Sequence, residues 1–296
     1  MVNQNQRVLP FVQLDVFTSV PLEGNQLAVF TDARGLSDDE MQSLAREMNL
    51  AETTFIVPRD PAIERERGVR VRIFTVAEEL PFAGHPTLGT AVVLRSGNGE
   101  LVSLDLNVGK IPVRFSERNG LTFGEMTQRA PEFGKIHSRE DVARAADLAL
   151  EDIADDVPIQ TVTTGNAFAI VPLRSRKALE NLKATWPRMQ GYLEKTDAKF
   201  FYFISRDPLN PAARLQARMP FYNGEDPATG SAAGPCIAWA VQYGVIAPGE
   251  QALMEQGLEI KRKSQIFVRA DKEGDQVVNV RVGGHAVKVV QGEVLL

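Results

Sequence analysis

The chain has 296 residues, 44% of them hydrophobic, with a net charge of −5 and a pI near 5.4. Its length allows two domains of ordinary size. Its acidity argues against nucleic acid as a partner, because binding to phosphates normally requires a basic surface. The single cysteine, Cys236, excludes an internal disulfide and favours a cytoplasmic location. No apolar run approaches the roughly 20 residues of a membrane span and we see no signal peptide, so we expect no membrane partner.

Residues 1–130 form the first of two predicted halves. Alternating, β-rich runs predict strands at 8–17, 27–30, 53–57 and 68–74, and three short strands between 101 and 123. Ser37 and Glu40 have the spacing of a capping box, which predicts a helix that ends near Asn49. A second helix, 86–94, is apolar almost all round, so we expect a sheet to wrap it.

Residues 131–296 form the second predicted half, and the boundary between the halves lies within a linker that we place at 128–137. The patterns predict helices at 138–150, 177–182, 189–193 and 231–243, strands at 160–164, 167–172, 200–204 and 215–221, and three or four closing strands within 260–295. We allow the last strands to cross to the first half. Each half is then a mostly antiparallel sheet around a central apolar helix, which is an α+β fold.

Two similar motifs occur in both halves at one displacement. The stretch 84–91 around His85 matches 225–232 around Asp226 at 141 positions, and Gly24-Asn25 matches Gly165-Asn166 at the same displacement. Residues 59–60 match 206–207 at 147 positions, as expected if one copy carries a surface insertion. We interpret the halves as two copies of one unit related by pseudo-symmetry.

Both helix starts have the composition of an anion-binding terminus. Proline is favoured in the first helical turn, and glycine lets a ligand approach the free N–H groups at the positive end of the helix dipole. If the two termini point into one cleft, they bring together His85, Asp226 and Ser231, to which we add Glu52 before a strand. Two carboxylates, an imidazole and a hydroxyl suit proton transfer at carbon, for which no metal or cofactor is needed.

Each of these residues also has an ordinary structural interpretation. Glu52 can be a surface residue, His85 can pack at a turn, Asp226 is a good N-cap, and Ser231 can be a simple first-turn hydroxyl. The three histidines lack metal-ligand spacing, so we expect no metal site. Cys236 lies inside an apolar helix and is expected in the core. No phosphate-binding glycine motif follows a strand.

Several motifs in this order resemble those of the PhzF-like phenazine-biosynthesis isomerases: 14–17, 24–25, 49–53, 80–89 and 225–232. The resemblance implies the diaminopimelate-epimerase-like fold, a homodimer, and cofactor-independent isomerisation of trans-2,3-dihydro-3-hydroxyanthranilate or a related small acid. It also implies that Glu52 is the acid/base, with His85 and Asp226 beside it. The substrate-binding residues that it implies are Asn25, Gly84, Gly230 and Ser231.

Two alternatives remain open. Classical epimerases of this fold have a cysteine at each helix start, where this chain has His85 and Asp226. An amino-acid or hydroxy-acid epimerase that works without thiols is therefore one alternative. The other is a non-catalytic binding protein that keeps the epimerase-like shell. Our leading hypothesis is the isomerase.

Overall fold

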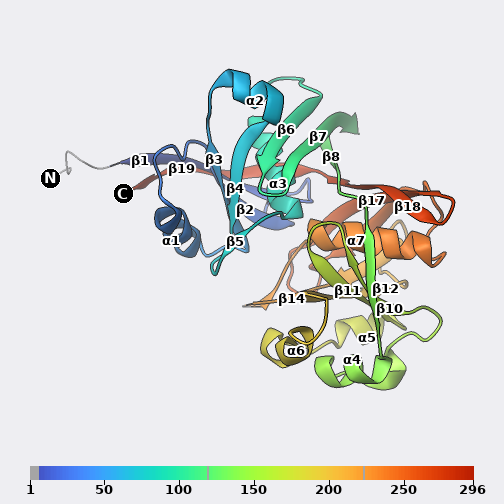
Figure 1. The fold of residues 1–296 in the computed structure, drawn as a ribbon. Helices are drawn as coiled ribbons and strands as arrows, with labels where there is room; N and C mark the ends of the chain where they lie inside the picture. The colour runs from blue at the N-terminus through green and yellow to red at the C-terminus, as the bar shows by residue number, and fades with distance from the viewer. Residues whose placement is uncertain (1–6, 119, 223) are drawn as a thin grey trace. The chain divides into compact units, whose positions relative to one another are not determined.

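The computed structural model of the chain describes residues 7–118, 120–222 and 224–296, which form two compact units. Unit 1 runs to Met126 and is completed by Gly284–Leu296, and unit 2 is Thr127–Gly283. Both units combine a mostly antiparallel sheet with helices (Figure 1), so the predicted α+β fold is confirmed. No helix in the described part of the chain is long and apolar enough to cross a membrane.

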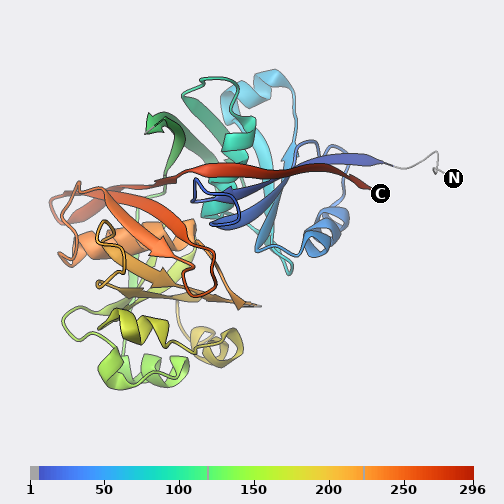
Figure 2. The same ribbon diagram turned by 180° about the vertical axis from the view of Figure 1, so that it is seen from behind.

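Unit 1 is built around the helix α3 (Gly84–Leu94), which contacts strands on several sides. Residues 84–91 of this helix are all buried, which agrees with the sheet that we expected to wrap this mostly apolar helix. The second view shows β19 running antiparallel beside β1 (Figure 2). The strands of unit 1 are β1 (Val8–Val16), β2 (Asn25–Phe30), β3 (Glu52–Val57), β4 (Val69–Phe74), β5 (Glu79–Leu80), β6 (Leu101–Leu106), β7 (Gly109–Arg118), β8 (Leu121–Thr127) and β19 (Ala286–Leu295).

A second helix of unit 1, α1 (Asp38–Met48), packs on β3 and β4 through its apolar stripe. The predicted capping box is confirmed, because Ser37 and Glu40 exchange side-chain to backbone hydrogen bonds. The buried face of α1 meets a row of three phenylalanines from neighbouring strands, Phe30, Phe55 and Phe74. This arrangement leaves α1 on one face of the strands and α3 on the other.

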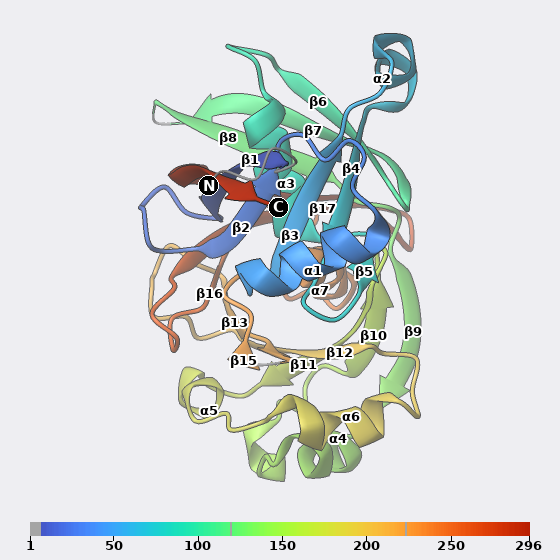
Figure 3. The same cartoon turned by 90° about the vertical axis from the view of Figure 1, so that its left-hand side faces the viewer.

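Unit 2 repeats the plan around α7 (Gly230–Gln242), of which residues 230–241 are buried. Figure 3 shows α7 on one side of the strands β10, β11 and β12, and α4 and α6 on the other. Cys236 lies in this helix with no exposed surface, as predicted. The remaining helices are α4 (Arg139–Ala146), α5 (Arg176–Glu180) and α6 (Trp186–Leu193). The strands are β9 (Glu132–His137), β10 (Ile159–Thr163), β11 (Ala167–Leu173), β12 (Phe200–Ser205), β13 (Leu215–Arg218), β14 (Pro220–Phe221), β15 (Gly224–Glu225), β16 (Ala252–Gln256), β17 (Ser264–Glu273) and β18 (Gln276–Gly284).

The two units share one strand connectivity. In unit 1, β2 pairs in parallel with β3, and β4 pairs in parallel with β6. In unit 2, β11 pairs in parallel with β12, and β13 pairs in parallel with β16. Leu27 lies opposite Glu52 in the first pair and Phe168 lies opposite Phe200 in the equivalent pair. Glu52 and Phe200 therefore occupy equivalent positions in the two copies.

The displacement of 141 positions that the sequence comparison assigned to the two copies is wrong at the starts of the central helices. Both central helices begin with a glycine, Gly84 and Gly230, which are 146 positions apart rather than 141. At this offset His85 matches Ser231, whereas the sequence comparison matched it to Asp226. Insertions of different length between the motifs changed the displacement along the chain.

Other differences concern short elements. The predicted linker 128–137 contains β9, which pairs with β10, and its mostly exposed residues carry no apolar alternation that reveals a strand. The predicted strand 215–221 is two strands, because β14 leaves β13 to form a hairpin with β15. The helix predicted at 138–150 ends at Ala146, where Asp147 adopts a left-handed conformation. The sequence analysis also missed two further elements, β16 and the helix α2 (Pro61–Arg67). The helix α2 buries no residue and so lacks an apolar stripe.

Candidate active site

Three predicted site residues of unit 1 meet at the start of α3. Asn25 begins β2, Glu52 begins β3 and His85 is the second residue of α3. The Asn25 Nδ2 atom lies 3.1 Å from His85 Nδ1, and His85 Nε2 lies 3.5 Å from the Glu52 Oε2 atom. Asn25 is 1%, His85 2% and Glu52 7% exposed. The interpretation of Glu52 as a surface residue is therefore wrong.

Burial fixes the charge of His85. Desolvation lowers the pKa of His85 to about 3, so the imidazole is neutral at pH 7. The contact with Glu52 is then not an ion pair, although it joins an imidazole to a carboxyl group. A neutral imidazole donates from one ring nitrogen and accepts at the other. Because the amide nitrogen of Asn25 only donates, Nδ1 of the neutral ring accepts from it, and Nε2 carries the proton that faces the Glu52 carboxyl group.

The backbone around this group is held closely. A Cβ atom at Gly24 would lie 2.4 Å from the Val16 carbonyl oxygen, and Gly24 has φ +68°, so only glycine fits before Asn25. On the other side, the Thr54 and Thr90 hydroxyls lie 2.9 Å apart and join β3 to α3. The strand that carries Glu52 and the helix that carries His85 are thus fixed to each other.

The N-cap residue of α3 makes no side-chain capping hydrogen bond. Ala83 is at the N-cap position and cannot accept a hydrogen bond through its side chain. The first-turn N–H groups at Gly84 and His85 therefore depend on other partners, and the helix dipole favours an anion there. The role predicted for Gly84, binding a substrate oxygen through its N–H group, would use this end of the helix.

In unit 2, Asp226 lies just before α7 and not at its N-cap, which is Thr229. The N-cap interpretation of Asp226 is therefore wrong. The Thr229 hydroxyl donates to the Asp226 carboxylate instead of capping its own helix. The Asp226 N–H donates to the Met219 carbonyl at 2.9 Å. Both the backbone and the side chain of Asp226 are thus fixed, and the residue is 6% exposed.

Gln256, which no sequence motif singled out, holds this loop in place. Its Nε2 donates to the Asp226 carbonyl at 2.7 Å and lies 2.9 Å from the Thr229 hydroxyl oxygen. Its Oε1 accepts from the Thr229 N–H at 3.1 Å and from the Tyr202 hydroxyl at 2.9 Å. Gln256 has no exposed surface. Its importance depends on contacts between segments far apart in sequence, so the sequence alone carried no signal for it.

Gly230 and Ser231, the remaining predicted residues, are the first two residues of α7. The Thr229 side chain makes no capping hydrogen bond to this helix. Gln128 donates to the Gly230 carbonyl at 2.9 Å and accepts from Thr164. The predicted site residues thus form one group in each unit: Asn25, Glu52, Gly84 and His85 in unit 1, and Asp226, Gly230 and Ser231 in unit 2. Within the described residues, no three His, Cys, Asp or Glu side chains gather as a metal-binding group.

An α+β fold built twice around a buried helix, with a carboxyl group and an imidazole at one helix start, is the fold of epimerase-like isomerases. The family model described as phenazine biosynthesis-like protein (PhzC-PhzF) matches residues 14–292, and the chain belongs to this family. The chain is 35% identical to the trans-2,3-dihydro-3-hydroxyanthranilate isomerase of Pseudomonas chlororaphis, over 97% of this chain and 99% of the relative. It is 32% identical to an uncharacterized isomerase of Mesorhizobium japonicum, over 97% and 98% of the two chains.

The fold is similar to the crystal structure of a PhzF-family phenazine biosynthesis protein from Bacillus anthracis. The TM-score is 0.86 at 27% sequence identity, over 98% of this chain and all of the other. Fold and sequence therefore agree that the chain is an isomerase of this family.

Proposed function

We propose that this isomerase moves a proton between carbons of a small carboxylate substrate that is trans-2,3-dihydro-3-hydroxyanthranilate or a close relative of it. The observation that carries the proposal is the buried pair of Glu52 and the neutral His85, 3.5 Å apart at the uncapped start of α3. The name of the Pseudomonas chlororaphis relative supports the choice of substrate.

In this proposal Glu52 acts as the general acid/base. Its carboxylate takes a proton from one carbon, and the resulting carboxylic acid exchanges with solvent and gives a proton to another carbon. One proton is removed and one is added, so the reaction is balanced without a redox partner. His85 and Asp226 polarise or orient the substrate. The N–H groups at Gly84 and Gly230 bind substrate oxygens and stabilise the negative charge that grows during proton removal. Asn25 and Ser231 complete the substrate-binding residues. Asn25 contacts His85, and Ser231 places its hydroxyl at the start of α7.

The test follows the proton by NMR. Purified protein in D2O is incubated with trans-2,3-dihydro-3-hydroxyanthranilate and with a panel of small amino and hydroxy acids. We expect double-bond migration with exchange at carbon, and a loss of about 10²–10⁴-fold in the Glu52→Gln variant, the range for removal of a general acid/base. Glu47→Gln is the matched control, because Glu47 is an exposed residue of α1. A fully active Glu52→Gln variant would contradict the assignment.

The same experiment distinguishes the alternatives. Deuterium at a stereocentre with inversion and without double-bond migration would identify an epimerase. Binding of these acids without exchange at any carbon would identify a binding protein. We also infer a homodimer in the cytoplasm: the family resemblance supports the dimer, and the lone Cys236 fits a reducing compartment. Light scattering after gel filtration measures the oligomeric state.

A further inference from the structure

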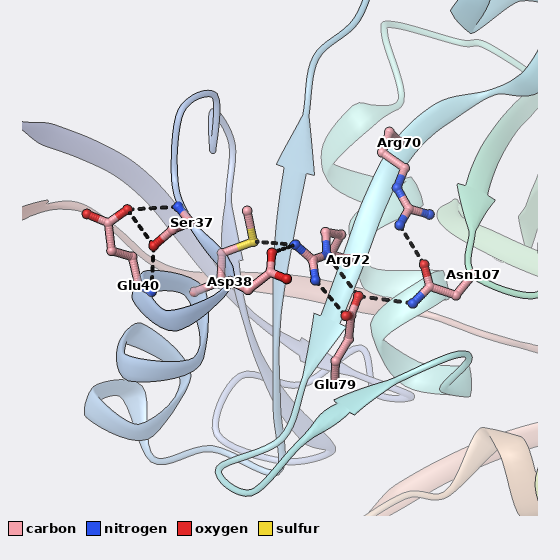
Figure 4. A network of polar contacts seen from close by, with 8 residues as sticks. Ser37, Asp38, Glu40, Arg70, Arg72, Glu79 and Asn107 are labelled. Carbon is pink, nitrogen blue, oxygen red and sulfur yellow. Dashed lines mark hydrogen bonds and ion pairs between the residues drawn. The ribbon is translucent and has the colours of Figure 1, made fainter.

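A half-buried arginine and glutamate form the same two-pronged pair in each unit. In unit 1, Arg72 of β4 donates from Nε to Glu79 Oε1 at 2.9 Å and from Nη2 to Oε2 at 2.6 Å (Figure 4). In unit 2, Arg218 of β13 donates from Nε to Glu225 Oε1 at 3.1 Å and from Nη2 to Oε2 at 2.6 Å. Side-chain exposure is 17% and 25% in the first pair and 11% and 9% in the second. We call each pair an Arg–Glu clamp.

The two clamps occupy equivalent places in the repeat. Each glutamate follows its arginine by seven residues and lies on the return strand of a hairpin. Phe74 pairs with Glu79 in the hairpin of unit 1, and Pro220 pairs with Glu225 in that of unit 2. In both units the central helix begins five residues after the glutamate, at Gly84 or at Gly230. The clamp therefore joins the strand that carries the arginine to the short segment that leads into the helix start.

Each guanidinium also binds a neighbouring helix, which fixes the clamp from a second side. Arg72 donates to Asp38 in the first turn of α1, and Glu79 accepts a further hydrogen bond from Asn107 at 3.0 Å (Figure 4). Arg218 Nη1 donates to three carbonyls at and after the end of α5, with the shortest bond, to Leu179, at 2.8 Å. Each guanidinium thus donates from more than one edge of its plane, which a lysine ammonium group could not reproduce.

We propose that Arg218 and Arg72 are positioning residues for the reaction, and that each clamp sets the place of the helix start that follows it. The case is strongest for Arg218, because its partner Glu225 is joined by a peptide bond to Asp226. At the same place in unit 1, Glu79 is followed by Leu80, a buried apolar residue. The clamp of unit 2 therefore acts directly on a proposed site carboxylate, and the clamp of unit 1 acts on Gly84 and the residue after it.

The experiment compares Arg218→Lys with Arg206→Lys. Arg206 also makes two bonds to one carboxylate, that of Asp156, both at 2.8 Å, but that pair lies on the surface with 37% and 56% exposure. Lysine keeps the charge in both variants and removes the two-pronged contact. We expect amide hydrogen exchange over 224–231 to become at least about tenfold faster in Arg218→Lys, which corresponds to about 1.4 kcal/mol, and to stay unchanged in Arg206→Lys.

Turnover supplies a second readout. We expect kcat to fall about tenfold or more in Arg218→Lys while KM changes less than about threefold, because misplacement of a site group mainly affects the transition state. Glu225→Gln, which keeps the acceptor and loses the charge, should fall between wild type and Arg218→Lys. The effect on turnover rests on the proposed function, whereas the effect on exchange does not. An inactive wild type would therefore count against the proposed function and leave the exchange comparison to decide on the clamp.

Two results would overturn the inference. One is equal exchange over 224–231 in the two lysine variants. The other is faster exchange throughout unit 2, β17 included, which would give Arg218 a general structural role instead of a positioning role.

Discussion

The burial of His85 as a neutral imidazole makes a prediction about stability and pH. The unfolded chain takes up a proton on this residue near its ordinary pKa of 6.5, and the folded protein does so only near pH 3. Between these values the unfolded state binds more protons, so acid favours unfolding. The stability that the buried neutral His85 contributes is fully present above the pKa of the unfolded state, and it decreases as the pH falls below that pKa.

The magnitude follows from the two pKa values. At pH 5 the unfolded residue is 1.5 pH units below its ordinary pKa of 6.5, and the folded residue is still neutral. Each pH unit corresponds to about 1.4 kcal/mol, so His85 alone should lower the free energy of unfolding by about 2 kcal/mol at pH 5 relative to pH 7. This is a large effect for one side chain in a protein of ordinary stability.

The assay is urea unfolding of the wild type and of His85→Asn at pH 7 and at pH 5. Asparagine keeps a polar group beside Asn25 and cannot take up a proton in this range. His137, whose pKa burial also lowers, is present in both proteins, and its contribution cancels in the comparison. The wild type should lose about 2 kcal/mol more than the variant between the two pH values. Equal losses, or an imidazole NMR signal of His85 that titrates near pH 6.5, would refute the reasoning.

Three further predictions concern stability and the loop at Asp226. Gly89→Ala should lower the free energy of unfolding by about 1–3 kcal/mol, because a Cβ there would lie 2.6 Å from Leu27 Cδ2. Gly191→Ala in α6, where a Cβ would meet nothing within 4 Å, should raise the free energy of unfolding by up to about 1 kcal/mol. Urea unfolding measures both. Ser37→Ala should lower the melting temperature through loss of about 1 kcal/mol of capping, and an unchanged melting temperature would contradict that estimate. Gln256→Leu should destabilise the protein by about 3 kcal/mol and reduce kcat, because it leaves buried backbone and hydroxyl groups without partners; a variant that keeps wild-type kcat would show that the Asp226 loop does not depend on this residue.

Local sequence patterns were sufficient for the elements that bury a complete apolar surface. The central helices were found because their residues are apolar on all sides, and α1 was found from its capping box and stripe. Elements without such a surface were missed. The helix α2 buries no residue, and β9 is mostly exposed, so neither leaves a periodic pattern in the sequence.

The sequence supplied a set of candidate site residues but not their geometry. Glu52, His85 and Asn25 were chosen separately, and only the register of β2 and β3 explains why they meet. The displacement between the copies is 141 at Leu27 and Phe168 and 146 at the helix starts, because insertions accumulate in loops. A fixed displacement in sequence therefore could not establish which residues are equivalent, whereas backbone pairing could.

In the corrected register, the two copies keep the same strand and helix order and differ at positions of the proposed site. Glu52 corresponds to Phe200, whose ring cannot accept a proton, so only unit 1 carries a carboxyl group at this strand position. Asp226 follows the glutamate of the Arg–Glu clamp in unit 2, and the equivalent residue of unit 1 is the buried Leu80. Because the carboxylates of the two units stand at different places of the repeat, they do not form a pair of matched bases like the two thiols expected of a classical epimerase. This asymmetry favours a reaction in which one carboxyl group, that of Glu52, both removes and returns the proton.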